Sequence, residues 1–325
     1  MASAERVVTR KRVGLRLTMA KRKAIEGYIY ISPWILGFTI FTLGPMLVSL
    51  YLGLTDFKIV TAPRFIGLAN YKELVRDPLF WKSLQNTLYY AAIFVPSNIL
   101  GSLGCALLLN RKIIGRAFFR SVYFMPSVTP LVAAAVLWMW ILNPQVGLLN
   151  YLLSFVGISP GPGWLGTTTW SKPALIIISL WGAVGGGTML IFLAGLQGVP
   201  RELLEAAEID GAGSWPKFWR VTLPLLSPTL FFNTVLGLIG AFQQFTLAYV
   251  ATSGAGQTRP AGGPLYSTMF YVLNLYQHAF DYWEMGYASA LAWVFFLIVL
   301  ALTYAQLRFA RRWVFYEASS GSGKW

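Results

Sequence analysis

Uncharged, apolar stretches alternate with short charged segments along the whole chain. Six stretches contain no Asp, Glu, Lys or Arg, and they run from Gly27 to Thr55, Ser83 to Asn110, Ser121 to Ser171, Pro173 to Pro200, Val221 to Thr258 and Met285 to Leu307. A helix needs about 20 apolar residues to cross a bilayer, because each residue adds about 1.5 Å toward a hydrocarbon core about 30 Å thick. All six stretches are long enough. The pattern therefore predicts an all-α integral membrane protein with six transmembrane helices.

The predicted spans cover about residues 31–54, 84–109, 120–142, 174–197, 225–251 and 286–308. They divide the chain into an N-terminal segment (1–26), a six-span domain (27–310) and a C-terminal tail (311–325). The long third stretch is predicted to hold one span only, because Asn143-Pro144 ends its helix. The apolar piece from Val146 to Ile158 is too short to cross, and it is predicted to be a helix on the outer membrane surface.

The composition and the placement of charge support this membrane interpretation. Only 12% of the residues are charged, whereas about a quarter are charged in a soluble domain. Of the 26 basic residues, 19 lie in the first 30 residues, the 110–120 and 196–224 loops and the C-terminal stretch from Arg308 onward. Because positively charged loops stay in the cytoplasm, both termini are predicted to be cytoplasmic. The cluster from Arg6 to Lys23 then contacts lipid headgroups rather than nucleic acid, despite a net charge of +14.

Several kinds of chemistry have no support in the sequence. The six stretches contain no histidine, and proton-coupled carriers usually keep an ionisable residue within the membrane. No metal-ligand cluster and no Ser/His/Asp set is visible, so neither a catalytic nor a metal site is predicted. The segment Gly321-Ser-Gly-Lys324 is not a phosphate-binding loop, because Trp325 stands where Ser or Thr is needed. The chain is therefore not predicted to hydrolyse ATP.

The loop 199–224, between the fourth and fifth spans, has the most informative sequence. It predicts two short helices around a turn at Gly211, which can take the left-handed conformation that ends a helix. Residues three and four apart form a face of the first helix that is mostly small or apolar: Leu203, Ala206, Ala207 and Asp210. Such a surface on a cytoplasmic loop predicts a partner that covers it. The simpler alternative is that Glu205 only pairs with Arg201, one turn earlier.

This loop resembles a known motif. Glu205-Ala206-Ala207, three residues, Gly211, nine residues and Val221-Thr-Leu-Pro224 are similar to the EAA loop of binding-protein-dependent ABC importer permeases. The resemblance implies the type I ABC importer permease fold and a coupling helix that sits in a cleft of a cytoplasmic ATPase dimer. Glu205 would then pair with a basic ATPase residue, and Ala206 and Ala207 would allow close packing. ATP and Mg would be bound by the ATPase, and no cofactor by this chain.

Other segments resemble the carbohydrate-uptake branch of that family, the maltose and glycerol-phosphate type in its compact six-helix form. They are Ser32-Pro-Trp34, Gly44-Pro45, Gly67-Leu-Ala-Asn-Tyr71, Asn86-Thr87, Gly262-Gly-Pro264 and Phe280 to Ala290. This resemblance implies a heterodimer with a second, homologous permease and delivery of substrate by an extracytoplasmic sugar-binding protein. The location would be the cytoplasmic membrane of a bacterium or archaeon. The substrate would be a sugar, an oligosaccharide or a polyol phosphate.

Few positions within the spans offer the hydrogen-bonding and aromatic groups that a sugar needs. Gln243 and Gln244 lie about midway along the fifth predicted span. The maltose permease has paired asparagines there, and Gln244 matches the one that contacts the sugar. Trp181 and Gly182, with the glycines that follow at 185–187, are predicted to interrupt the fourth span at another candidate contact.

These candidates have plainer explanations. The glutamines can instead hydrogen-bond between helices, and the glycines can be a packing motif. Asn86 and Asn98 in the second span are predicted to be packing groups. Two other functions remain as alternatives, a carrier or channel that works without an ATPase, and a membrane-embedded enzyme. For the enzyme, Asp281 and Glu284 are the only close acidic pair in the predicted outer loops.

Overall fold

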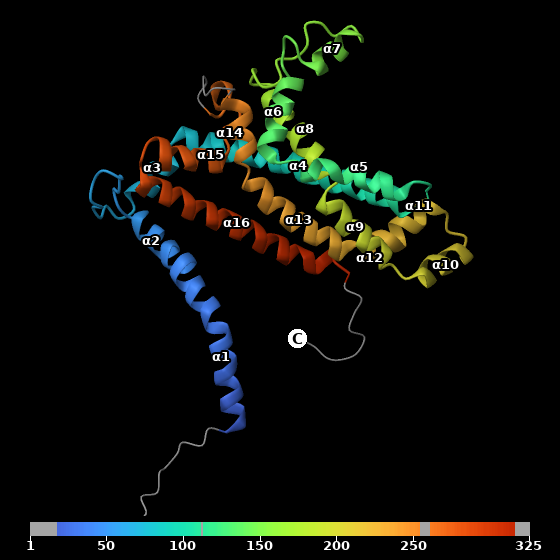
Figure 1. Ribbon diagram of the computed structural model, residues 1–325, viewed down its shortest axis with the longest axis horizontal. Helices are drawn as coiled ribbons and strands as arrows, with labels where there is room; N and C mark the ends of the chain where they lie inside the picture. The colour runs from blue at the N-terminus through green and yellow to red at the C-terminus, as the bar shows by residue number, and fades with distance from the viewer. Residues whose placement is uncertain (1–17, 112, 254–260, 316–325) are drawn as a thin grey trace, which may run out of the picture. The chain divides into compact units, whose positions relative to one another are not determined.

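The computed structural model describes residues 18–111, 113–253 and 261–315, which form helices joined by loops (Figure 1). Apart from two isolated bridges, no β-strand occurs within these ranges. The chain divides into two units, one up to Tyr51 and one from Leu52 onward, and each is described by itself. The expectation of an all-α chain is confirmed.

The first unit is one helical run. It consists of α1 (Met19–Phe38), the π-helical turn η1 (Thr39–Leu43) and α2 (Gly44–Leu52). The run is 34 residues long and apolar enough to cross a membrane. It begins 12 residues before the predicted start at 31, because the basic residues that precede the apolar stretch are helical as well. The predicted basic segment 1–26 falls mostly outside the described residues.

The second unit is built around α4 (Pro78–Asn110), which follows the short helix α3 (Ala69–Arg76). The Asp77 side chain caps α4 by accepting a hydrogen bond of 2.8 Å from the backbone N–H of Leu79. Pro78 occupies the first turn, where a missing N–H costs nothing. Pro96 lies inside α4 without ending it. α4 packs against the helices of the fourth and fifth predicted spans, which makes it the centre of the unit.

The third and fourth predicted spans are both broken. In place of one helix over 120–142 there are α5 (Arg116–Val128) and α6 (Leu131–Ile141), bent by 95°. Pro130 explains this correction, because it lacks an N–H and forces Thr129 into an extended conformation. The fourth span consists of α8 (Ser171–Ala183) and α9 (Gly187–Gln197), bent by 49°. The fourth span is interrupted near its middle as predicted, but only residues 184–186 are not helical, and Trp181 and Gly182 lie within α8.

The fifth span is broken as well. After α10 (Arg201–Ile209), the chain forms α11 (Ser214–Lys217), the π-helical turn η2 (Phe218–Thr222), α12 (Leu223–Leu225), α13 (Ser227–Phe242) and α14 (Thr246–Ser253). Between the last two helices, Gln244 and Phe245 are not helical. The predicted span 225–251 therefore consists of more than one helix.

The last part of the chain matches its prediction closely. The segments η3 (Pro264–Tyr266), α15 (Tyr271–Tyr276) and η4 (Gln277–Asp281) lead into α16 (Met285–Trp313), which contains the predicted span 286–308. Three continuous helical runs are long and apolar enough to cross a membrane, and the number reaches six if each bent pair is one crossing. The apolar piece after the third span forms the short helix α7 (Leu148–Ser154). The predicted tail 311–325 is described only up to residue 315.

Polar residues of α4 join it to its neighbours. The Asn86 amide donates to the backbone carbonyls of Tyr266 (2.8 Å) and Met269 (2.9 Å), and its oxygen accepts from Lys172 (3.1 Å). Asn98 is also buried, and its side-chain oxygen lies 3.2 Å from the Ser102 hydroxyl oxygen of the same helix. The predicted packing role is confirmed for Asn86, whereas the contact of Asn98 stays within α4. Buried polar groups that are paired across helices, as Asn86 is, fix how the helices are aligned.

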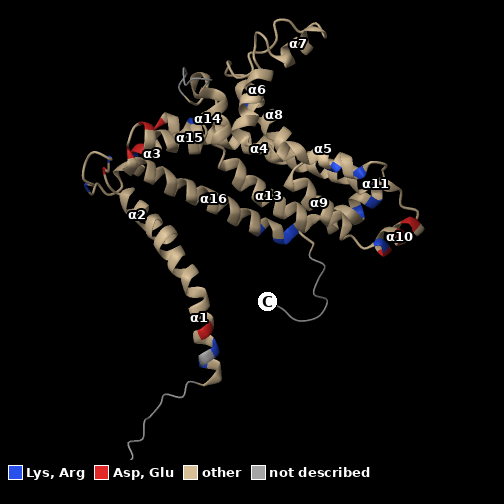
Figure 2. Cartoon of the chain, in the orientation of Figure 1, with Lys and Arg blue, Asp and Glu red and all other residues tan. Residues whose placement is uncertain are grey.

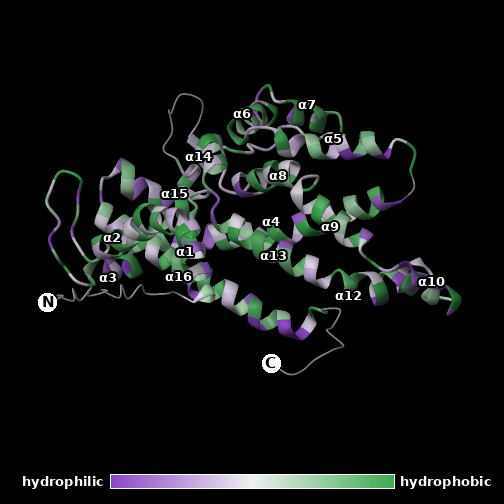
Figure 3. Ribbon diagram, turned by 60° about the horizontal axis from the view of Figure 1, so that its bottom comes forward, coloured by the Kyte–Doolittle hydropathy of each residue, from purple (hydrophilic) through white to green (hydrophobic). Residues whose placement is uncertain are grey.

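Charge gathers at the two ends of the second unit (Figure 2). One group of charged residues surrounds α3, and the other surrounds α10, α11 and the C-terminal end of α16. The helices between them carry mostly apolar residues (Figure 3). This distribution is the one that a membrane-spanning bundle requires.

The close approach of α8–α9 to α5 gives a first prediction. A Cβ atom at Gly185 would overlap the backbone carbonyl of Tyr123, whereas one at Gly187 would meet nothing within 4 Å. Gly185→Ala is therefore expected to destabilise the protein by about 1–3 kcal/mol. Gly187→Ala, the matched control, should leave the thermal unfolding temperature in detergent nearly unchanged. Equal melting temperatures for both variants would contradict this packing.

Candidate functional site

A pocket of about 400 Å³ lies where three broken helices meet. Thr129 comes from the α5–α6 break, Ala183 from the end of α8, and Gln244 from the α13–α14 break, and all three line the pocket. Broken helices are tolerated inside a membrane where their free backbone groups are buried in protein or line a cavity. In this chain the interruptions converge on one cavity.

The lining of the pocket is neutral, with hydroxyl, amide and aromatic groups. No charged side chain belongs to it among the described residues. Its hydrogen-bonding side chains are those of Tyr90, Ser127, Thr129, Ser179 and Gln244, and its other aromatic rings are those of Phe94 and Trp181. A few well-placed polar groups on an apolar wall are typical of small-molecule sites. This chemistry suits a ligand that has both hydroxyl groups and an apolar face.

The structure brings three of the four predicted contact residues together. Gln244, Trp181 and Gly182 all line the pocket. The Trp181 ring packs edge-on against Trp138, with 5.9 Å between the ring centroids. A Cβ at Gly182 would meet nothing within 4 Å, so the cavity is open at this position. Gln243 follows the last residue of α13, is exposed and does not line this pocket.

Sequence reasoning missed the contribution of α4 and of Ser179. Tyr90 is only 2% exposed, and its hydroxyl donates a hydrogen bond of 2.8 Å to Ser179. The Gln244 amide donates to the same Tyr90 oxygen at 3.4 Å, a long hydrogen bond. A spacing of four residues places Asn86, Tyr90 and Phe94 along one side of the helix. That spacing is the signal that could have identified the α4 residues.

The turn after α10 has the geometry expected of it. Gly211 has a φ of 80°. The N–H of Ala212 donates to the Ala207 carbonyl at 2.9 Å, and the N–H of Gly211 donates to the Glu208 carbonyl at 3.0 Å. These two bonds form a Schellman motif, which ends a helix firmly. The predicted left-handed conformation of Gly211 is confirmed.

The surface of α10 is available to a partner. Glu205 makes no hydrogen bond or ion pair within the described part of the chain, so the suggested pair with Arg201 does not form there. The neighbouring Glu208 is instead paired with Lys217 of α11. Glu205, Ala206 and Asp210 are exposed, Ala207 is half-buried, and Ile209 is 87% exposed. Glu205 and Ile209, one turn apart on the same helix, are therefore both accessible to another protein.

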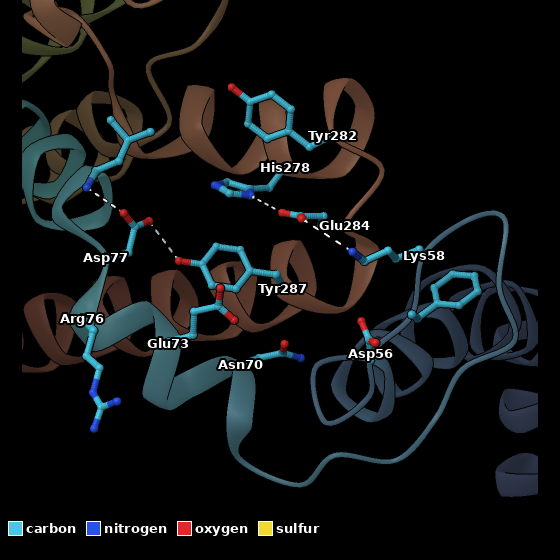
Figure 4. Close-up of a pocket in the computed structure, with 12 residues that line it drawn as sticks. Asp56, Lys58, Asn70, Glu73, Arg76, Asp77, His278, Tyr282, Glu284 and Tyr287 are labelled. Carbon is cyan, nitrogen blue, oxygen red and sulfur yellow. Dashed lines mark hydrogen bonds and ion pairs between the residues drawn. The ribbon is translucent and has the colours of Figure 1, made fainter.

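A second, charged pocket of about 500 Å³ lies at the other charged end of the unit (Figure 4). One carboxylate oxygen of Glu284 lies 2.9 Å from Nδ1 of His278. The other lies 3.9 Å from the Lys58 ammonium nitrogen. Across the pocket, the Tyr287 hydroxyl donates to Asp77 at 3.0 Å. These contacts join the loop before α3 and the cap of α4 to the start of α16.

The aromatic wall of the charged pocket is un-ionised at neutral pH. Burial raises the pKa of the Tyr282 hydroxyl, and the nearby Tyr266, Asp281 and Glu284 add to the shift. No group of three or more His, Cys, Asp or Glu side chains in the described ranges could hold a metal ion. The polar side chains of the pocket are instead joined in pairs, His278 with Glu284 and Tyr287 with Asp77.

Comparison with known proteins decides the family. Residues 98–314 match the model of the binding-protein-dependent transport system inner membrane component. The chain belongs to this family. It is 41% identical over 300 residues to the probable ABC transporter permease protein YesP of Bacillus subtilis, covering 92% of this chain and 94% of that one. It is 34% identical over 299 residues to the lactose transport system permease protein LacF of Rhizobium radiobacter, covering 91% and 97%.

The fold agrees with that assignment. A bacterial alginate ABC transporter, solved in complex with an alginate pentasaccharide-bound periplasmic protein, contains a chain that superimposes with a TM-score of 0.77. The two chains are 21% identical, and the alignment covers 91% of this chain and 98% of that one. The protein thus has the importer permease fold, and it is an inner-membrane transport component rather than an enzyme.

The contact between Tyr287 and Asp77 gives a second prediction. Tyr287→Phe removes one donor from a half-buried carboxylate, which is expected to cost about 1.5 kcal/mol of stability. Tyr304→Phe is the matched control, because Tyr304 lies on the same helix, is 63% exposed and has no hydrogen-bond partner in the described ranges. Thermal unfolding in detergent measures both. A melting temperature for Tyr287→Phe as high as that of the control would contradict the role of this contact.

Proposed function

We propose that the chain is the membrane-spanning subunit of an ATP-driven importer that takes up a carbohydrate delivered by an extracytoplasmic binding protein. It works as a heterodimer with a second, homologous permease, above a cytoplasmic dimer of ABC ATPases. Both termini and the α10 loop are cytoplasmic, as the distribution of basic residues favours. Family membership supports the import function, and names of relatives such as the lactose permease support a sugar as cargo.

The surface of α10 is the observation that supports ATP coupling most directly. A nine-residue helix ended by a Schellman motif is a firm element, and Glu205 and Ile209 remain exposed on it. The resemblance of its sequence to the coupling helix of ABC importers gives this surface a partner, the ATPase. Glu205 then pairs with a basic residue of that partner, and Ala206 and Ala207 let the two surfaces approach closely.

The neutral pocket supports a carbohydrate as the transported molecule. Gln244 offers hydrogen bonds, and Trp181 offers a flat apolar surface against which a sugar ring can rest. The second permease would complete the cavity. Opening and closing of the ATPase dimer would expose this cavity to one side of the membrane and then to the other, by a different fit of α10 in each state.

Reconstitution tests the proposed function. The full importer in liposomes, with its binding protein outside and ATP inside, should accumulate labelled sugar, and accumulation should stop when ATP is removed. Glu205→Gln, which keeps the shape of the side chain but removes its charge, is expected to lower uptake about tenfold, as for the loss of about 1.4 kcal/mol of coupling. Glu202→Gln, on the same helix, is the control. Uptake that continues without ATP would instead support a carrier or channel.

The turn at Gly211 gives a separate prediction. A side chain at a φ of 80° costs about 1–2 kcal/mol, so Gly211→Ala should distort the end of α10 and lower ATP-driven uptake by up to about tenfold. Gly213→Ala is the matched control, because Gly213 has a φ of −66°, which any residue adopts. Co-purification of the ATPase and the rate of uptake measure the effect. Equal uptake by the two variants would contradict a coupling role for the turn.

A further inference from the structure

Three consecutive hydrogen bonds run along the wall of the neutral pocket. The Gln244 amide nitrogen contacts the Tyr90 hydroxyl at 3.4 Å, and the Tyr90 hydroxyl contacts Ser179 at 2.8 Å. The Ser179 hydroxyl in turn contacts the backbone carbonyl of Leu175 at 2.8 Å. The series connects the α13–α14 break to α4 and then to α8. We call it the Gln244–Leu175 chain.

The direction of the Gln244–Leu175 chain follows from its last member. A backbone carbonyl only accepts, so the single proton of the Ser179 hydroxyl is committed to Leu175. The Ser179 oxygen then accepts the proton of Tyr90, and the Tyr90 oxygen is left to accept from Gln244. The oxygen and the nitrogen of a glutamine side-chain amide are otherwise hard to distinguish. The Gln244–Leu175 chain of hydrogen bonds determines which of the two atoms faces Tyr90. The amide nitrogen faces Tyr90.

The amide oxygen of Gln244 is consequently the free end. It accepts no hydrogen bond from any described residue, and it is not buried away from the cavity that Gln244 lines. The Tyr90 ring that holds the amide is itself fixed, because it stacks on Phe94 (centroids 5.1 Å apart) and meets Phe270 edge-on (5.3 Å). An acceptor held in one orientation discriminates between ligands better than one that can turn over.

We propose that Tyr90 is a positioning residue, which holds Gln244 so that the pocket presents a fixed acceptor to one hydroxyl group of the transported sugar. This proposal rests on the proposed function and identifies the group of the sugar that the pocket recognises. A deprotonated phosphate or carboxylate oxygen cannot donate to the amide oxygen and is repelled by it, so the group that Gln244 contacts is a hydroxyl. A sugar hydroxyl donates readily, and Trp181 covers the apolar face of its ring.

The experiment uses the reconstituted importer and a set of sugar analogues in which one hydroxyl at a time is replaced by fluorine. Fluorine keeps the size of the group and removes the proton that is donated. Each analogue is first titrated against the binding protein, so that uptake can be compared at saturating loaded binding protein. The maximal rate then reports on the permease step and not on delivery.

For the unaltered importer, fluorine at one position is expected to lower the maximal rate of uptake about tenfold. In Tyr90→Phe the same replacement should matter less than about twofold, because the amide is no longer oriented. Ser179→Ala leaves the Tyr90 proton to be donated to the amide oxygen, which turns the amide nitrogen toward the cavity. That variant should also lose most of the discrimination, because an amide nitrogen can donate to the hydroxyl oxygen and no longer requires the hydroxyl proton. Tyr89→Phe, an exposed neighbour that does not line the pocket, is the control and should behave like the unaltered protein.

The outcomes separate the two proposals. Full discrimination in a Tyr90→Phe importer that elutes as a single species would overturn the positioning role, as would equal behaviour of Ser179→Ala and the unaltered protein. Equal maximal uptake of every fluorinated analogue by the unaltered importer would overturn the hydroxyl contact at Gln244. If the unaltered importer takes up no carbohydrate at all with ATP present, the proposed function itself is wrong.

Discussion

Interrupted helices inside an apolar bundle are the feature on which the rest of this structure depends. Each interruption frees backbone N–H and C=O groups that lipid cannot satisfy. The second unit meets this requirement with side chains and with tight local turns. The Ser102 hydroxyl of α4 donates to the freed Val184 carbonyl at 2.8 Å, and the N–H of Gln243 donates to the Ile239 carbonyl at 3.2 Å. The breaks are therefore stable features rather than frayed ends.

With their backbone groups hydrogen-bonded, the breaks create a polar site without any charge. A straight helix hides its backbone and turns its side chains by a regular angle, so polar side chains from three such helices rarely meet. Ending α13 at Phe242 releases Gln244 from the helical repeat, and its side chain can then reach Tyr90. Burying neutral amides and hydroxyls costs little free energy when they hydrogen-bond to one another, whereas burying an unpaired charge costs much more. The wall that this chain contributes to the pocket is therefore polar and neutral.

The sequence predicted the helices well where length and charge decide them. The last span lies within α16, and the left-handed turn at Gly211 is where glycine is needed. The sequence pattern did not predict the helix break at Pro130. Pro96 is the same type of residue, yet α4 continues through it without a break. A proline removes one hydrogen bond, and whether the helix then ends depends on neighbours that sequence alone does not reveal. Helix packing decided those two cases differently.

The candidate site shows the same limit. Gln244, Trp181 and Gly182 could be predicted because their residue types are unusual within apolar spans. Tyr90 could not, since its partners lie 89 and 154 residues away along the chain. A tyrosine in a membrane helix gives no sign of which residues its hydroxyl will meet. Only the folded arrangement of α4, α8 and the α13–α14 break shows that it connects them.

The same breaks define the bodies that α10 can move. α9 runs from the fourth-span break to the start of the α10 loop, and α13 runs from the far side of that loop to the break at Gln244. The two helices pack closely, because a Cβ at Gly195 would stand 2.9 Å from the hydroxyl oxygen of Thr229. Under the proposed coupling, a movement of α10 would therefore reach both helices: α13 ends just before Gln244, which lines the pocket, and α9 begins after the break that follows Ala183, which also lines it. Since packed helices shift as rigid bodies, such a movement would change the distance between the pocket walls. Ligand binding between those walls would then bias α10 in return.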